Sequence, residues 1–156
     1  MATYSYMTNE EAQLFERGSW IYPYPVAISC GRIVRSRTPE TFLDALLKGA
    51  EILTRYLASI SLASYSVRDD AADSPDLFAE LAGPLSFGHF LSINQQIAKI
   101  ACGHPAKSYL NAGFVGKEGT GPTDEALTKL LNLRNELGHD LSSITRPKAI
   151  SELHEH

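Results

Sequence analysis

The chain has 156 residues, of which 44% are hydrophobic and 21% are charged, and its formal net charge at pH 7 is -4. A chain of this length can bury one core of ordinary size, so we expect a single compact unit. The acidic balance argues against a general attraction to nucleic acid or to anionic membranes. Any contact with RNA must therefore depend on a local basic cluster.

The two cysteines, Cys30 and Cys102, lie far apart and have no CxxC or Cys/His spacing. This pattern indicates neither a disulfide framework nor a zinc site, and we expect no metal and no cofactor. No apolar run approaches the roughly 18 to 20 residues of a membrane span, and the start MATYSYMTNEEAQ lacks the features of an export signal. We therefore expect a cytoplasmic protein with no membrane contact.

Residues 1–37 differ in pattern from the rest of the chain. Thr8 and Glu11 have the spacing of a capping box, which predicts a short helix that stops at Gly18. Pro23 and Pro25 then predict an extended strap, because proline restrains both itself and the residue before it. The strap is expected to cover one end of a helical core, or to stack on peptide or bases, through Trp20, Tyr22, Tyr24 and Val26.

A long helix is predicted from about residue 40 to residue 66. Thr38 suits its cap and Pro39 its first position. Apolar residues recur at intervals of three and four, at Leu43, Leu46, Leu47, Ala50, Leu53, Leu57 and Ile60. Glu51 and Arg55 lie off this stripe with the spacing of an ion pair, and they are candidate supporting residues.

Three further helices are predicted towards the C-terminus. One runs up to Gly103 with inward positions Phe87, Phe90, Leu91, Ile97 and Ile100. The next begins near Pro122 and buries Leu127, Leu130, Leu131, Leu133 and Leu137. A short final helix begins at Pro147. The sequence thus predicts an all-α bundle of four to five helices.

The helix from Pro122 ends in RNELGHD, where polar groups follow a leucine-rich run. At about 100° per residue, Asn135 and His139 share a face, whereas Arg134 lies roughly 140° from His139 if the helix stays regular. The two groups can converge after Gly138 loosens the last turn, or when two copies of the helix meet across a twofold axis. This pattern makes a homodimer part of the hypothesis.

Arg134 to His139 resembles the R-x4-6-H motif of HEPN domains, in the variant with asparagine directly after arginine. The resemblance covers residues 38 to 150 and implies a HEPN-like helical domain over 38–156. It also implies a metal-independent endoribonuclease that acts as a dimer in prokaryotic defence or stress response, with Arg134, Asn135 and His139 as the catalytic residues. A toxin subgroup of the family has tyrosine where this chain has Leu141.

The residue chemistry suits that implication, because His139 can exchange protons near neutral pH and Arg134 can hold a phosphate. Arg32, Arg35 and Arg37 form a local basic cluster that either contacts RNA or is solvated surface. Structural roles stay open as well, with Arg134 bridging to Asp140 or Glu125. The alternative function is a non-catalytic dimerisation or protein-interaction module of a larger protein, with other domains or a regulatory partner.

Overall fold

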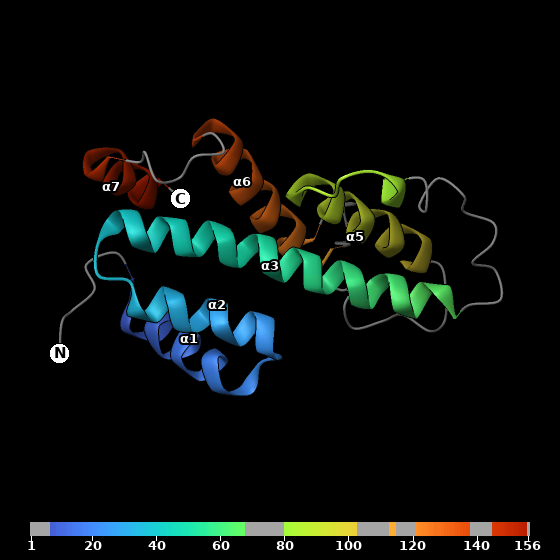
Figure 1. Cartoon of the computed structure of the whole chain (residues 1–156), viewed down its shortest axis with the longest axis horizontal. Coiled ribbons are helices and arrows are strands. Elements are labelled where there is room, and N and C mark those ends of the chain that lie inside the picture. The colour runs from blue at the N-terminus through green and yellow to red at the C-terminus, as the bar shows by residue number, and fades with distance from the viewer. Residues whose placement is uncertain (1–6, 68–79, 103–112, 115–120, 138–144, 156) are drawn as a thin grey trace. The chain divides into compact units, whose positions relative to one another are not determined.

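The computed structural model describes residues 7–67, 80–102, 113–114, 121–137 and 145–155, and the regular structure in these ranges is helical, without strands. The predicted all-α class is confirmed. The helices are α1 (Asn9–Ile21), α2 (Tyr24–Arg35), α3 (Pro39–Ser66), η2 (Glu80–Ala82), a short 3-10 helix, α5 (Phe87–Cys102), α6 (Pro122–Leu137) and α7 (Arg146–Glu155) (Figure 1). Among these described helices, none has the combination of length and apolar character that crossing a bilayer requires.

Helix α1 begins with the predicted capping box. The backbone N–H of Thr8 donates to Glu11 Oε2 at 2.7 Å, and the backbone N–H of Glu11 donates to Thr8 Oγ1 at 3.2 Å. The predicted stop at Gly18 is wrong, because α1 continues to Ile21. An added Cβ at Gly18 would lie 2.9 Å from the Tyr22 ring and 3.0 Å from Cys30 Sγ. Gly18 therefore serves the close approach of α1 and α2 rather than the end of a helix.

The extended strap, predicted from Ser19 onwards, is wrong except around Tyr22 and Pro23, because residues 19–21 belong to α1 and residues 24–35 form α2. Tyr22 is extended, as expected, with φ -81° and ψ 158°. Pro23 is the N-cap of α2 and Pro25 lies in its first turn, where a missing N–H breaks no helical hydrogen bond. The two prolines therefore start a helix instead of excluding one.

The aromatic residues around Pro23 do not cover the core. Val26 is buried, but Trp20, Tyr22 and Tyr24 are 83%, 44% and 78% exposed. Helices α1 and α2 pack side by side in Figure 1 through other residues, including Gly18 and Cys30. The rings are thus left on the surface at the turn between the two helices.

Helix α3 has nearly the predicted bounds. Its first turn is capped by Thr38, whose Oγ1 accepts from the backbone N–H of Thr41 at 3.3 Å. Leu43, Leu47 and Ala50 are buried as the periodicity predicted. Further along the helix, the buried positions are Thr54, Ala58, Ser61 and Tyr65, one residue away from the predicted stripe.

The chain divides into two compact units. The first consists of Met1–Leu53 and Leu133–His156, and the second of Thr54–Asn132. In the first unit, a core of Ile33, Phe42 and Ala45 is covered by partly buried residues, which are Met7, Phe15, Leu46 and Leu153. Residues from α1, α2, α3 and α7 therefore share one core, and this core positions the candidate site.

The second unit has its own core, formed by Ala58, Tyr65, Phe90, Ile93 and Ile97. Four of the predicted inward residues of α5 are buried, namely Phe87, Phe90, Leu91 and Ile97. Helix α5 also buries Asn94, which donates through Nδ2 to the carbonyls of Thr54 and Phe90, both at 3.0 Å. Its Oδ1 accepts from Ser61 Oγ at 3.2 Å.

Candidate nucleic-acid interface

Arg134 lies near the C-terminal end of α6 and forms an ion pair with Glu51 of α3. The distance from Nη2 to Glu51 Oε2 is 3.1 Å, and each side chain is 21% exposed. A half-buried pair of this kind restrains both side chains, because separating them would leave a charge with little solvent around it. Since a guanidinium has five N–H donors, this pairing leaves others for a phosphate.

The structure describes one of the other two motif residues, Asn135, but not His139. Asn135 is exposed on α6. His139 lies outside the described residues, and α6 ends at Leu137. The angular argument for a continuous helix therefore does not extend to His139. Its convergence with Arg134, within one copy or between two, stays a prediction.

The supporting residues Glu51 and Arg55 both take part in interactions that the sequence did not reveal. Glu51 holds Arg134, as described above. The guanidinium carbon of Arg55 lies 5.0 Å from the centroid of the Phe90 ring, which is a cation–π distance. The predicted ion pair between Glu51 and Arg55 stays a prediction.

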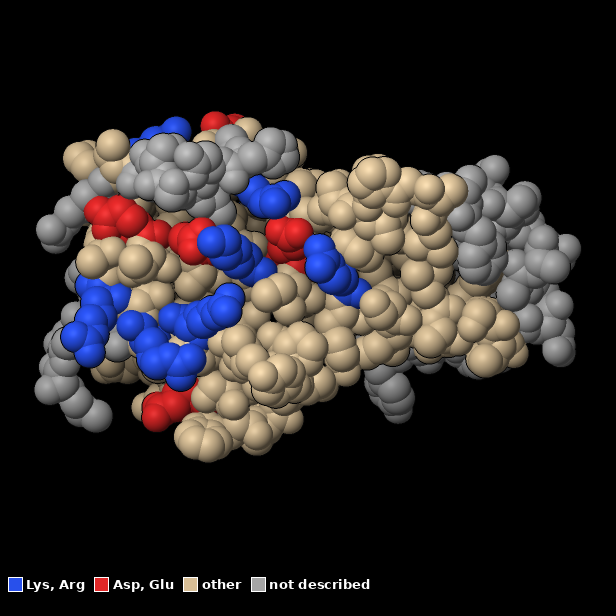
Figure 2. All heavy atoms as spheres, viewed as in Figure 1, with Lys and Arg blue, Asp and Glu red and all other residues tan. Residues whose placement is uncertain are grey.

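The predicted basic cluster lines one open pocket at the corner between α2 and α3. The pocket has a volume of about 530 Å³, and its charged lining residues are Arg32, Arg35, Arg37, Asp44 and Lys48. Figure 2 shows Lys and Arg side chains gathered over this part of the molecule. Four cations against one carboxylate give the lining a formal net charge of +3, opposite in sign to the charge of the whole chain.

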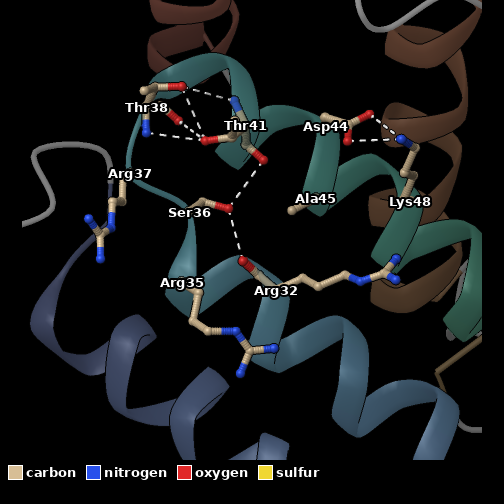
Figure 3. A pocket seen from close by; sticks show the side chains of 9 residues that line it. All are labelled: Arg32, Arg35, Ser36, Arg37, Thr38, Thr41, Asp44, Ala45 and Lys48. Atoms are coloured by element: carbon tan, nitrogen blue, oxygen red, sulfur yellow. Dashed lines mark hydrogen bonds and ion pairs between the residues drawn. The ribbon is translucent and has the colours of Figure 1, made fainter.

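Side-chain hydrogen bonds of Ser36 hold the backbone that carries these arginines. Ser36 Oγ lies 2.9 Å from the carbonyl of Arg32 and 3.2 Å from the carbonyl of Thr41, so it ties the end of α2 to the first turn of α3. Figure 3 shows the side chains of Arg32, Arg35 and Arg37 spread around Ser36. The arginines therefore project from a rigid corner.

The charges of this pocket are unequally paired. Lys48 Nζ lies 2.8 Å from Asp44 Oδ1 and donates to Asp44 Oδ2 at 2.9 Å. Within the described part of the chain, the structure records neither an ion pair nor a side-chain hydrogen bond for Arg32, Arg35 or Arg37. Three neighbouring cations that pair with no carboxylate of the described residues repel one another, and an anion in the pocket would relieve that repulsion.

Sequence reasoning found the three arginines but missed the residues that complete the pocket. Lys48 and Thr41 were not predicted to take part in a binding pocket, and Thr38 was predicted only as the cap of α3. The missing signal was the helical state of residues 24–35, which brings Arg32 and Arg35 to the same corner as Lys48. The Glu51–Arg134 pair had no sequence signal, because no local spacing links the two residues.

The described residues offer no group of three or more His, Cys, Asp or Glu side chains arranged to hold a metal ion. Cys30 is buried beside Gly18, and burial raises the pKa of its thiol. A raised pKa disfavours the reactive thiolate, so Cys30 is suited to packing rather than to nucleophilic chemistry.

Comparisons with protein-family models, with curated proteins and with solved structures find no match to this chain. Any functional conclusion therefore rests on its residues and their geometry.

Proposed function

We propose that this chain is a metal-independent endoribonuclease of the HEPN type, acting as a homodimer in a prokaryotic defence or stress-response system. The observation that carries the proposal is the position of Arg134. Its guanidinium is anchored by Glu51 yet still partly exposed, at the end of the helix that leads into the motif. An oriented cation of this kind is what stabilisation of a phosphoryl transition state requires.

The proposed reaction needs no metal, because RNA carries its own nucleophile. His139 accepts the proton of the ribose 2'-OH as the 2'-oxygen attacks phosphorus, and the bond to the 5'-oxygen breaks as that oxygen takes up a proton. The products carry a 2',3'-cyclic phosphate and a 5'-hydroxyl. Arg134 stabilises the charge that develops on the phosphate, and Asn135 orients a phosphate oxygen or the imidazole.

The arginine pocket supports this proposal as a second place for RNA to bind. Arg32, Arg35 and Arg37 lack counter-charges in the described part of the chain and project from a fixed corner. Contacts with phosphate position a nucleic acid but do not read its sequence. We therefore assign these three arginines to RNA binding and the motif residues to cleavage.

The direct experiment is cleavage of generic RNA in EDTA by purified protein. His139→Ala is expected to slow cleavage by about 10² to 10⁴-fold, the usual contribution of general acid–base catalysis. Arg134→Lys, which keeps a cation for Glu51 but removes the planar donor pair, is expected to lower the rate while the protein stays folded. Lys129→Ala, which removes an exposed cation elsewhere on α6, is the matched control and should cleave normally.

One observation favours a second function, a non-catalytic dimerisation or protein-interaction module. The Arg134–Glu51 pair also suits a purely structural role, in which the guanidinium neutralises a half-buried carboxylate. This function predicts a dimer by sedimentation velocity with no cleavage at any protein concentration. It also predicts that Arg134→Ala lowers stability, whereas His139→Ala changes neither stability nor any activity.

A further inference from the structure

The turn between α1 and α2 exposes a group of large apolar side chains. Trp20, Ile21, Tyr22 and Tyr24 are 83%, 59%, 44% and 78% exposed. Single exposed apolar residues are common, but four large exposed apolar residues within five positions of the sequence favour a binding surface. Pro23 lies among them as the N-cap of α2.

One face of α2 joins these rings to the arginine pocket. At about 100° per residue, Arg35 lies about 20° and Arg32 about 80° from Tyr24 around the helix axis. All three side chains are exposed. Their α-carbons span about 16 Å along the helix, at about 1.5 Å per residue between Tyr24 and Arg35. Aromatic and cationic side chains therefore share one side of a short, regular helix.

Between Tyr24 and Arg35, few side chains project far from this face of α2. Gly31 lies between Tyr24 and Arg35 on this face. An added Cβ at Gly31 would be 3.2 Å from the Arg35 guanidinium, so the Arg35 side chain lies back along α2 over Gly31. Ile28, on the same face, is partly buried. A flexible chain that lies along α2 can thus reach both the rings and the guanidinium groups.

We propose that this face of α2 binds a single nucleic-acid strand, with bases stacked on Tyr24 and Trp20 and phosphates held by Arg32, Arg35 and Arg37. Base stacking on aromatic rings combined with a positively charged path is the usual chemistry of single-strand binding. A duplex does not fit this surface, because its bases are already stacked on one another and cannot reach the rings. The proposal rests on the RNA contact proposed above for the three arginines and specifies the form of the strand.

The sequence contains one tryptophan, so tryptophan fluorescence, excited selectively over that of the tyrosines, reports on Trp20 alone. The wild-type chain is titrated with a 2'-O-methyl RNA strand and with a DNA strand of the same sequence, neither of which has the 2'-OH needed for cleavage. Quenching is expected with one or both strands, and the comparison tells a ribose-based from a deoxyribose-based ligand. A blunt duplex of the same sequence is expected to quench at least about tenfold more weakly at equal concentration, since its bases are not free to stack.

Variants then separate the two ends of the surface. Tyr24→Ala is expected to weaken binding of the same strands about 5- to 100-fold, the range for loss of one stacked base. If three phosphates are held, the slope of log affinity against log salt is about -2, and each arginine-to-alanine substitution makes it shallower by about 0.7. Val67→Ala and Lys129→Ala remove an exposed apolar residue and an exposed cation elsewhere, and should change nothing.

Three outcomes of the strand-binding experiments overturn the proposal. They are binding without any change in Trp20 fluorescence, equal binding of the duplex, and strand affinity that is unaffected by Tyr24→Ala and the arginine substitutions. A fourth, self-association that Trp20→Ala and Tyr24→Ala abolish while no strand binds, identifies the surface as a contact between copies and also overturns it. Failure of the proposed ribonuclease is separate: strand binding with Trp20 quenching but no RNA cleavage keeps this inference and removes that function.

Discussion

Gly18 and Gly31 lie in neighbouring helices but have different surroundings. A methyl group at Gly18 would meet the Tyr22 ring and the buried sulfur of Cys30, whereas one at Gly31 would meet only the flexible end of Arg35. Alanine favours a helix over glycine by about 1 kcal/mol, so the two substitutions share the same intrinsic gain. The free energies of unfolding of the two alanine variants should therefore differ only by the cost of the close contact at Gly18.

We expect Gly18→Ala to destabilise the protein by about 1 kcal/mol, because overpacking in a buried contact outweighs the gain in helix propensity. Gly31→Ala, the matched control, is expected to be neutral or slightly stabilising, because the Arg35 side chain can move aside. Urea denaturation followed by circular dichroism measures both. Equal stability of the two variants would show that α1 and α2 do not approach closely at Gly18.

The candidate site shows what a sequence predicts of single residues. Arg134 was recognised from its neighbours Asn135 and His139, which are local in sequence. Its partner Glu51 comes from a different helix, and the pairing depends on how α3 and α6 pack, which no spacing reveals. The three arginines were found because they are clustered in sequence, but their pocket depends on the course of α2 and α3.

At the scale of the element, capping signals and apolar periodicity predicted the helices well. The starts of α1, α3 and α6 and the length of α3 follow from local residues. Helix α2 was missed because its two prolines were interpreted as helix breakers, although both lie at positions where a helix needs no N–H donor. The positions of the two prolines, rather than their number, determine that residues 24–35 form a helix.

The cap of α1 makes stability depend on pH. Two hydrogen bonds to its carboxylate lower the pKa of Glu11 below its ordinary value of 4.5. The bond from the Thr8 backbone N–H has the larger effect, and the bond from the Thr8 hydroxyl has the smaller one. A lowered pKa means that the folded state favours the charged carboxylate. This contribution is fully present above the ordinary pKa and disappears as the pH falls through the lowered one.

We therefore expect the stability difference between wild type and Glu11→Gln to be present at pH 7 and to shrink towards zero below the ordinary pKa of 4.5. The effect is small, because the pair is exposed to solvent. Urea denaturation of both proteins across this pH range is the measurement. Glu16→Gln, an exposed change in the same helix, is the control. A difference that grows as the pH falls would contradict the assigned cap.

Helix α5 carries a buried amide that the apolar pattern did not predict. Asn94 is 2% exposed and bonds to two carbonyls and to Ser61. Asn94→Leu removes these bonds and leaves the Ser61 hydroxyl buried without this acceptor. We expect a loss of about 2 kcal/mol in the free energy of unfolding, the usual cost of an unsatisfied buried group. Lys99→Ala, an exposed change in the same helix, should cost little, and an equal loss from both changes would rule out a special role for Asn94.

At the scale of the whole molecule, the all-α class followed from the sequence, but the two compact units did not. The division falls between residues 53 and 54, inside α3, and between residues 132 and 133, inside α6. Neither helix has a proline or a glycine at these points. The buried positions of α3 also continue at intervals of three and four through Leu47, Ala50, Thr54 and Ala58, so its buried face does not mark the division.

Two sites of this molecule are proposed to act on RNA, the motif that begins near the end of α6 and the basic pocket beside α2. The first is proposed to cut RNA and the second to hold it. Because binding by the pocket can persist without cleavage, the chemical nature of the product ends is more informative than any affinity.

The most direct test is mass spectrometry of RNA incubated with the purified chain in EDTA. The account predicts fragments with 2',3'-cyclic phosphate and 5'-hydroxyl ends, formed by wild type and by Lys129→Ala but strongly reduced with Arg134→Lys and His139→Ala. Intact RNA with the wild-type protein, or fragments formed equally by His139→Ala, would contradict it.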